Sequence, residues 1–246
     1  LDEWRRRQGC LLIVDEIQTG MYRTGPFCRS ETLGLAPDLM LLGKATSDMM
    51  FPFSLTLYSD AVAESLQGRG EGLVETIRGR YGYELGYRTV VNALQTAEEM
   101  GISERVVRAG ARFEEKLREG LATVGSVRDV RVFGLLAAVE LDARRGPRRW
   151  LRKRLGALYL LAMLRRERSS LLAGFCQYEP NTLKITPPLN VRDDEIDGAC
   201  ETIIDVLRRP LPRVLLAGIA QLARPSPFRK GIHEHGDRRP VEFAER

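Results

Sequence analysis

The stretch LLIVDEIQTGMYRTG at residues 11–25 joins an apolar run to a carboxylate and then to a turn that contains glycine. The apolar run, residues 10–14, has the length and composition of a buried strand in a parallel sheet. A second apolar run lies in PDLMLLGKA at residues 37–45 and ends at Gly43 and Lys44. Strands separated by short turns and helices predict part of an α/β sheet in this region.

A second unit is expected beyond residue 100. Runs at residues 127–133 and 135–141 are typical of strands, and a helix, two short strands and a closing helix follow them. This order predicts an α+β unit distinct from the first. The last residues contain several prolines and have little periodicity, which predicts a linker or tail. The expected organisation is therefore residues 1–100, residues 101–209 and a tail at residues 210–246.

Composition favours a globular protein with a sizeable core. Of the 246 residues, 43% are apolar, which is enough for one large domain or two smaller ones. The longest apolar stretches, residues 155–164 and 214–222, are shorter than the roughly 20 residues of a membrane-spanning helix. Together with the lack of an opening signal peptide, this favours the cytoplasm. The four cysteines lie far apart without a CxxC pair, so we expect reduced thiols.

A net charge of +5 raises the question of nucleic-acid binding. The densest basic run, residues 144–154, contains only Trp150 as an aromatic residue that stacks on bases, so a solvated helix face is expected there. His233 and His235 form an HxH pair in the expected tail, but no third ligand accompanies them. Neither nucleic acid nor a metal ion is therefore expected as a partner.

Asp15 follows the pattern of a buried strand, and a carboxylate in that position needs a cationic partner. One interpretation is the metal-binding strand of a nucleotide triphosphatase, which requires a phosphate loop of the form GxxxxGK[ST]. Before Lys44, Asp38 replaces the first glycine of that loop, and Ala45 stands where Ser or Thr is needed. A second interpretation is a helix cap or a structural ion pair. In the third, Asp15 holds a protonated pyridine nitrogen and a nearby lysine binds the same cofactor.

The third interpretation is favoured because the two stretches together resemble the signature of the class III pyridoxal-phosphate-dependent aminotransferases. Lys44 follows Asp15 by 29 residues, as the corresponding lysine and aspartate do in that family. The matching positions are Asp15, Glu16, Gln18, Thr19, Gly20, Arg23, Thr24, Gly25, Pro37, Asp38, Gly43 and Lys44. The resemblance implies that Lys44 forms a Schiff base with pyridoxal 5'-phosphate and moves the substrate proton as a neutral amine. It also implies that Asp15 keeps the pyridine nitrogen protonated and that Gln18 contacts the phenolic oxygen of the cofactor.

The resemblance extends into the second unit. GLLAAVEL at residues 134–141 is similar to a strand of the family's small domain, and NTLKITPPLNVRDDEID at residues 181–197 is similar to its closing segment. There the family usually has an arginine that grips a substrate carboxylate, and this chain has Lys184, which lacks the bidentate fork. Where the family usually has a threonine that reaches the phosphate of the neighbouring subunit's cofactor, this chain has Arg80, with Tyr81 or Tyr83 as alternatives.

The fold implied by this resemblance is the C-terminal part of a type I pyridoxal-phosphate transferase, in which a mainly parallel sheet of the large domain precedes a small α+β domain. It implies a homodimeric enzyme, similar to ornithine or putrescine aminotransferase, that transfers an amino group from an amine, diamine or amino acid to a 2-oxo acid. The resemblance covers residues 1–209 and lacks the family's phosphate-cradling loop and ring-stacking aromatic, so we expect a fragment. Two alternatives stay open: a mutase or decarboxylase of the same fold, and a catalytically inactive fragment that acts as a binding or regulatory module.

Overall fold

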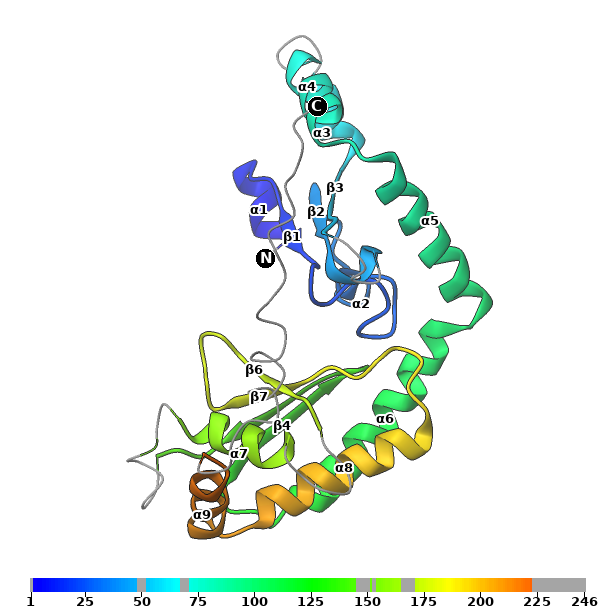
Figure 1. Cartoon of the computed structure of the whole chain (residues 1–246). Helices are drawn as coiled ribbons and strands as arrows, with labels where there is room; N and C mark the ends of the chain where they lie inside the picture. Colours follow the sequence, from blue (N-terminus) through cyan, green and yellow to red (C-terminus); the bar gives the residue numbers. More distant parts are fainter. Residues whose placement is uncertain are drawn as a thin grey trace, which may run out of the picture.

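The computed structural model describes residues 2–47, 52–66, 71–144, 151, 154–164 and 171–222, which form two lobes joined by a long helix (Figure 1). The N-terminal lobe (described residues of 2–81) contains α1 (Asp2–Gln8), β1 (Ile13–Asp15), α2 (Arg29–Thr32), β2 (Leu39–Leu42), the 3-10 helix η1 (Lys44–Ser47), β3 (Leu55–Tyr58), α3 (Asp60–Leu66) and α4 (Glu71–Tyr81). Helix α5 (Glu84–Glu99) leads to the second lobe. This C-terminal lobe (described residues of 102–222) contains α6 (Ile102–Leu121), β4 (Val127–Phe133), β5 (Leu136–Leu141), α7 (Leu155–Leu164), β6 (Gly174–Phe175), β7 (Thr182–Ile185), α8 (Asp193–Arg208) and α9 (Leu211–Leu222).

The N-terminal lobe is built on a three-stranded sheet of order β1-β2-β3. β1 runs parallel to β2, with Asp15 opposite Leu41, and β3 runs antiparallel to β2. Parallel strands end at the same edge of a sheet, so Asp15 and the residues after β2 lie close together. The expectation that the first strand is buried is wrong for the described part of the chain, where Ile13 is 59% exposed. Ile13 and Asp15 are exposed and Val14 between them is half-buried, so the described elements leave the Ile13 side of β1 uncovered.

An ion pair fixes α1 to the residue just before β2. The guanidinium of Arg5 donates to Asp38 at 2.5 Å, and the same carboxylate accepts a hydrogen bond from the backbone N–H of Leu12 at 2.7 Å. Asp38 therefore anchors the helix before β1 and the strand beside it, which is a structural role for this signature residue.

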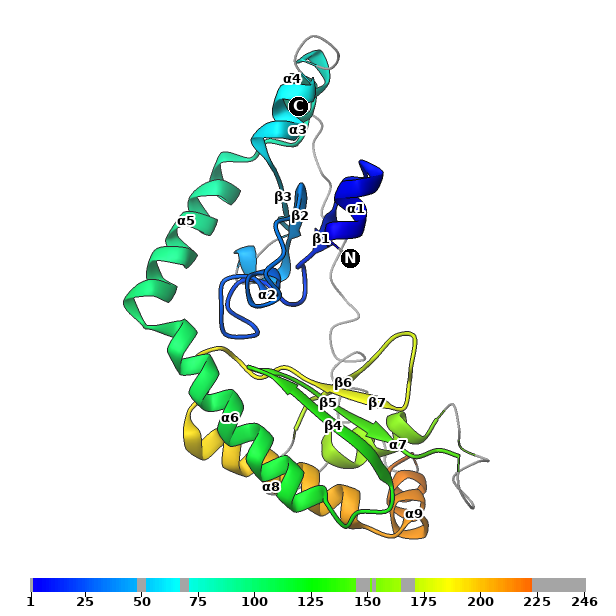
Figure 2. The same cartoon turned by 180° about the vertical axis from the view of Figure 1, so that it is seen from behind.

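The C-terminal lobe carries a four-stranded antiparallel sheet of order β4-β5-β7-β6. Helices α6 and α8 lie against one face of this sheet, and the N-terminal lobe lies beyond the other (Figures 1 and 2). Residues at helical spacing on α6 predict one apolar face, and the structure buries all of them: Val106, Phe113, Leu117 and Leu121. In β7, Lys184 stands between the buried Leu183 and Ile185, so its side chain lies on the sheet face away from the helices.

Helix α9 occupies the start of the segment that was expected to be a linker or tail. Val214 of this helix is 1% exposed and belongs to the core of the lobe, and Leu211 packs against that core. Pro212 lies in the first turn, where its missing N–H costs no hydrogen bond of the helix. The burial of apolar residues on one side of α9 therefore outweighs the effect of the prolines, which had predicted a linker or tail.

Several sequence expectations fall outside the described residues. These include residues 223–246, with His233 and His235, and most of the basic run at residues 144–154. Among the described residues, no helix combines the length and apolar character needed to cross a membrane. The described part of the chain also holds no cluster of three or more side chains suited to a metal ion.

Candidate active site

Asp15 and Lys44 come from neighbouring strands that end at one edge of the N-terminal sheet. Asp15 lies opposite Leu41, and Lys44 begins η1 three residues later. The Asp15 carboxylate is exposed, and it accepts a hydrogen bond from the backbone N–H of Ile17 at 2.9 Å. Among the described residues, neither Asp15 nor Lys44 forms an ion pair. Both charged groups are therefore available to a ligand at this edge.

The turn after Asp15 is held by Glu16, whose side chain is 2% exposed. Its carboxylate accepts hydrogen bonds from the backbone N–H of Ser30 in α2, at 2.6 Å, and from the Thr19 hydroxyl. Burial alone would raise the pKa of Glu16, but the hydrogen bonds from Thr19, Ser30 and the start of α2 outweigh burial and leave this pKa lowered. The ionised carboxylate caps α2 and so fixes the backbone that carries Asp15 and Gln18.

Lys44 has a backbone conformation that is unusual for a lysine. Its φ is 53°, in the left-handed region where a residue with a Cβ loses about 1–2 kcal/mol. The residue follows the buried Leu42 and Gly43, which anchor the backbone before it. Its exposed side chain lines the cavity between the two lobes. Backbone strain of this kind gathers at functional sites, so the conformation supports Lys44 as a site residue.

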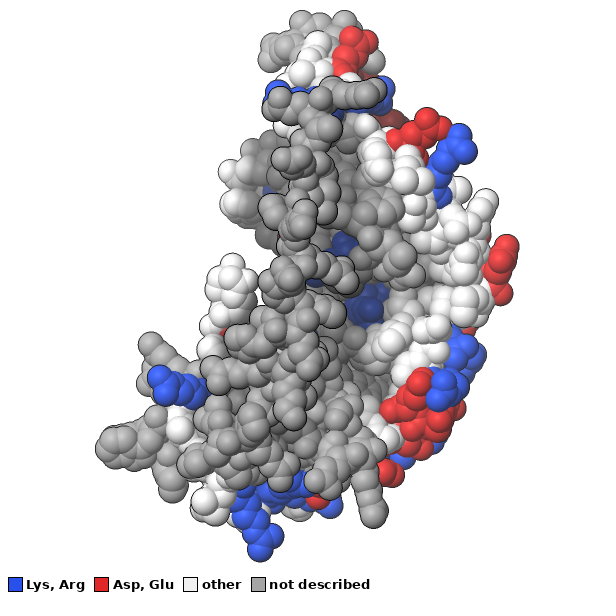
Figure 3. All heavy atoms as spheres, viewed as in Figure 1, with Lys and Arg blue, Asp and Glu red and all other residues white. Residues whose placement is uncertain are grey.

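A cavity of about 870 Å³ lies between the two lobes and collects residues from distant parts of the chain. Gln18 enters it from the turn after β1, Lys44 from the start of η1, and Lys184 from β7. The Nζ of Lys184 donates a hydrogen bond to Oε1 of Gln18 at 3.5 Å, so these two residues meet across the lobes. Figure 3 shows lysine and arginine side chains in the narrow region between the two lobes. Three of the five predicted site residues therefore surround one cavity.

One wall of this cavity is a face of α5 that the sequence reasoning missed. Thr89, Asn92 and Thr96 line the cavity at intervals of three and four residues, and Ala93 and Ala97 lie among them. The signal in the sequence was a run of small and polar residues at helical spacing. Taken alone, such a run is typical of a solvated helix face, so only the opposing lobe identifies it as a wall.

The cavity is positively charged. Arg23, Lys44 and Lys184 line it, and no Asp or Glu occurs among its lining residues in the described part of the chain. Arg23 is partly removed from water, and this burial lowers its pKa. Because three cations face the cavity without an acidic counterpart, its walls favour a carboxylate or phosphate ligand.

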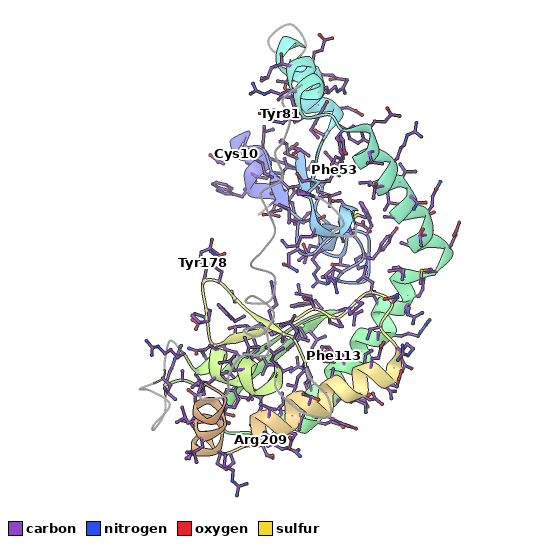
Figure 4. The ribbon with its side chains drawn as sticks, in the orientation of Figure 1. Cys10, Phe53, Tyr81, Phe113, Tyr178 and Arg209 are labelled. Carbon is purple, nitrogen blue, oxygen red and sulfur yellow. The ribbon has the colours of Figure 1, made fainter. Side chains whose placement is uncertain are left out.

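Arg80 is not part of this cavity. It lies on α4, where its guanidinium stands over the ring of Tyr81 at 5.8 Å from the ring centroid. Figure 4 shows Tyr81 at the outer end of the N-terminal lobe, away from the narrow region between the two lobes. Asp15 does not line the cavity either, but its carboxylate accepts a hydrogen bond from the backbone N–H of Ile17, which does. Within one chain, the structure therefore leaves Arg80 apart from the other candidate residues.

Comparison with known proteins identifies relatives over most of the chain. The family model described as aminotransferase class-III matches residues 1–207. The ornithine aminotransferase of Bordetella pertussis is 34% identical over 202 residues, which cover 82% of this chain and 44% of that protein. The acetylornithine aminotransferase of Methanothermobacter thermautotrophicus is 27% identical over 207 residues, which cover 84% of this chain and 47% of that protein.

Solved structures agree with these matches. The ornithine aminotransferase of Toxoplasma gondii, described as showing partial occupancy of PLP at its active site, matches with a TM-score of 0.67 and 27% identity. The match covers 84% of this chain and 45% of that one. The family predicted from the signature and the predicted α/β fold are thereby confirmed. The chain spans less than half the length of each of these relatives.

Proposed function

We propose, because this chain belongs to the aminotransferase class-III family, that it is the part of a pyridoxal-phosphate-dependent aminotransferase that carries the reactive lysine, Lys44. The reaction would transfer an amino group from an amine, diamine or amino acid to a 2-oxo acid. The relatives are ornithine and acetylornithine aminotransferases, so donors of that type are the first to test. The observation that carries the proposal is a lysine amine in a cationic cavity, beside the strand that ends in Asp15.

The residues around the cavity fit pyridoxal phosphate. This cofactor carries an anionic phosphate, a basic ring nitrogen and a carbonyl group that reacts with amines. The cationic walls suit an anionic cofactor and substrate, the exposed carboxylate of Asp15 beside the cavity suits the ring nitrogen, and the amine of Lys44 suits the carbonyl group. A volume of about 870 Å³ is in the range of sites that hold a cofactor with a small substrate.

Each of these residues has a defined task in the proposed reaction. Pyridoxal phosphate, when bound, withdraws electrons from the substrate carbon that loses its proton. Lys44 would hold the cofactor through Nζ and would carry the substrate proton at the same atom. Asp15 would accept a hydrogen bond from the protonated ring nitrogen, and Gln18 would donate one to the phenolic oxygen from its amide group.

Lys184 would bind a carboxylate of the substrate. Its amine donates to Gln18 in this structure, and a carboxylate that enters the cavity would compete for that donor. An ammonium group holds a carboxylate at one point, because it lacks the two parallel donors of an arginine. The orientation of the substrate would therefore depend on other polar residues of the same wall, such as Thr186 and Asn190.

Further parts of the proposal concern the whole protein. A homodimer is proposed, with Arg80 directed to the cofactor phosphate of the neighbouring subunit; its distance from its own cavity supports this assignment. The proposed domains are residues 1–100 and 101–209, divided near the junction of α5 and α6, and α9 is then an addition to the second domain. A cytoplasmic location is proposed because all four cysteines are free thiols.

Reductive labelling tests the role of Lys44. The chain is incubated with pyridoxal phosphate, reduced with borohydride and mapped by peptide mass spectrometry. We expect the label on the Lys44 peptide in preference to Lys116, an internal reference that pairs with Asp197 on the outside of the C-terminal lobe. Lys44→Arg should lose that label and keep the weak labelling of Lys116. Equal labelling of the two lysines would contradict the proposal.

The second candidate is a binding module without catalysis, and exposed apolar residues favour it. Trp4, Leu11 and Ile13 are each at least 59% exposed around the edge strand β1, a surface suited to pairing with another polypeptide. This candidate predicts no preference for Lys44 in the labelling experiment. A mutase or decarboxylase of the same fold would label Lys44 but would not move an amino group to an added 2-oxo acid, which amino acid analysis detects.

A further inference from the structure

Arg23 makes several of the hydrogen bonds that join the two lobes. One nitrogen of its guanidinium, Nη1, donates to the carbonyl oxygen of Pro187 at 2.6 Å and to that of Leu135 at 3.2 Å. Its own carbonyl oxygen accepts a hydrogen bond from the backbone N–H of Leu135 at 3.0 Å. Arg23 therefore attaches the N-terminal lobe to two separate segments of the C-terminal lobe.

The backbones of the two lobes are in close contact beside Arg23. A Cβ at Gly134 would lie 2.7 Å from the carbonyl carbon of Thr24 in the other lobe. On its other side Gly134 is held by its own lobe, since a Cβ at Gly110 of α6 would lie 2.5 Å from the carbonyl oxygen of Gly134. Both distances are shorter than a side chain tolerates, so only glycine allows this approach. The hydrogen bonds of Arg23 thus lie at the edge of a tightly packed contact and depend on its geometry.

Arg23 is also close in sequence and in space to the residues of the cavity. It lies five residues after Gln18, and its acceptor Pro187 lies three residues after Lys184. Gln18 and Lys184 are the pair that meets across the lobes at 3.5 Å. One side chain therefore holds the two segments that bring this pair together.

The charge of Arg23 is costly where it stands. The side chain is partly buried, and among the described residues no carboxylate pairs with it. Carbonyl oxygens alone compensate a buried cation poorly, and an uncharged side chain would avoid this desolvation. A partly buried cation without a carboxylate partner, on the wall of a cationic cavity, is typical of a functional site.

We propose that Arg23 is a positioning residue, which holds the two lobes at the separation that places Gln18 against Lys184 and Lys44 at the cavity between them. This inference rests on the proposed function of the cavity. A misplacement of about 1 Å can slow a reaction roughly a hundredfold, so a change in lobe separation has chemical consequences.

Spin labels on the two lobes test the geometric part. Figure 4 shows Cys10 on the N-terminal lobe and Tyr178 at the tip of the loop between β6 and β7. Labels are attached to Cys10 and to Tyr178→Cys in a chain that also carries Cys176→Ser, and double electron–electron resonance measures the distance between them. Labels should not reach the other two cysteines, because Cys28 and Cys200 are buried.

We expect a narrow distance distribution with Arg23 and a broad or shifted one with Arg23→Gln. Arg23→Lys keeps the charge but is one bond shorter, so it should give an intermediate result. The matched control is Arg118→Gln, since Arg118 is exposed on α6 and pairs with Glu114 of the same helix. An unchanged distribution in Arg23→Gln would overturn the proposal.

Labelling by pyridoxal phosphate tests the chemical part. In Arg23→Gln the labelling rate of Lys44 relative to Lys116 should fall roughly tenfold to a hundredfold, with partial recovery in Arg23→Lys and no change in Arg118→Gln. If Arg23→Gln broadens the distance distribution between the spin labels but leaves the ratio of Lys44 to Lys116 labelling unchanged, Arg23 is only a structural contact. That result would overturn its positioning role. If the parent chain shows no preference for Lys44, the proposed function fails, whereas the distance measurement still decides whether Arg23 sets the lobe separation.

Discussion

Replacing Gly134 with alanine tests the contact between the lobes from the side of the C-terminal lobe. Gly134 has a φ of 55°, and an added Cβ would lie 2.7 Å from the carbonyl carbon of Thr24 and 2.9 Å from the carbonyl oxygen of Arg23. Both neighbours are backbone atoms, which cannot rotate away as the end of a long side chain does. We therefore expect Gly134→Ala to lower the free energy of unfolding and to loosen the contact between the lobes.

Two costs add in this variant, and one gain offsets them. An alanine in the left-handed region costs about 1–2 kcal/mol. Relieving the overlap with Thr24 and Arg23 costs a further 1–3 kcal/mol or so, as for other overpacked sites. The lower flexibility of the unfolded alanine chain returns about 0.4–1 kcal/mol. The expected loss in the free energy of unfolding is therefore about 1–5 kcal/mol.

Urea unfolding followed by circular dichroism measures this loss, and Gly101→Ala is the matched control. Gly101 has a φ of 57°, and its Cβ would meet only the side chain of Glu104, at 3.6 Å. The control therefore has the left-handed cost and the same unfolded-chain offset but no overlap, so its loss should be smaller, about 0–1.6 kcal/mol. Gly134→Ala should exceed it by about 1 kcal/mol or more. Equal losses in the two variants would show that Gly134 does not press on Thr24, and would refute the reasoning.

Two further predictions concern charge and thiol chemistry. A hydrogen bond from Arg112 holds the pKa of Asp197 at about 2, below its usual 3.8. This pair should therefore stabilise the fold above about pH 4 and lose that effect as the pH falls towards 2. In Asp197→Asn, the midpoint of urea unfolding should depend less on pH across this range. Burial raises the pKa of both Cys28 and Cys200 to about 12. Iodoacetamide at pH 8 should therefore modify the exposed Cys10 first, which mass spectrometry detects. Rapid modification of Cys28 in the native chain would contradict its burial.

Asp15 and Lys44 show what can be predicted about a site from sequence. Each follows an apolar run, and their mutual placement needs only the knowledge that the two runs are parallel neighbours, since such strands end at the same edge. The pairing of Asp15 with Leu41 shows this placement. The information is local to two short segments, so a signature motif captures it. The chemical roles of the two residues remain proposals.

The contacts of Arg23 show what sequence reasoning cannot supply. Its guanidinium reaches carbonyl groups 112 and 164 residues further along the chain, at Leu135 and Pro187. Which carbonyl groups face this side chain depends on how the lobes dock, and no periodicity within either segment encodes that. The cavity-lining face of α5 could not be predicted for the same reason. Its Thr and Asn residues line a cavity only because the C-terminal lobe lies opposite them.

The burial of β1 and of α9 also differs from what their local patterns predict, whereas the apolar face of α6 is buried as its spacing predicts. The apolar run before Asp15 is typical of a buried strand, yet β1 lies at the edge of the described sheet and Ile13 is exposed. The proline-rich stretch after α8 is typical of a tail, yet Val214 enters the core. An apolar segment tends to be buried, but the elements that pack around it determine whether it is.

Under the proposed function, the charge of the cavity bears on which amino donor the protein would accept. Arg23, Lys44 and Lys184 face the cavity, and no acidic residue does so in the described lining. These walls attract carboxylates and repel a second ammonium group, such as that of an ω-amino acid donor like ornithine. A counter-charge for that ammonium has to come from outside these walls, either from the neighbouring subunit of the proposed dimer or from the part of the relatives that this chain does not span. In the proposed reaction, acceptor binding would need only carboxylate recognition, which we assign to Lys184, so the choice of donor would depend on residues beyond the described cavity.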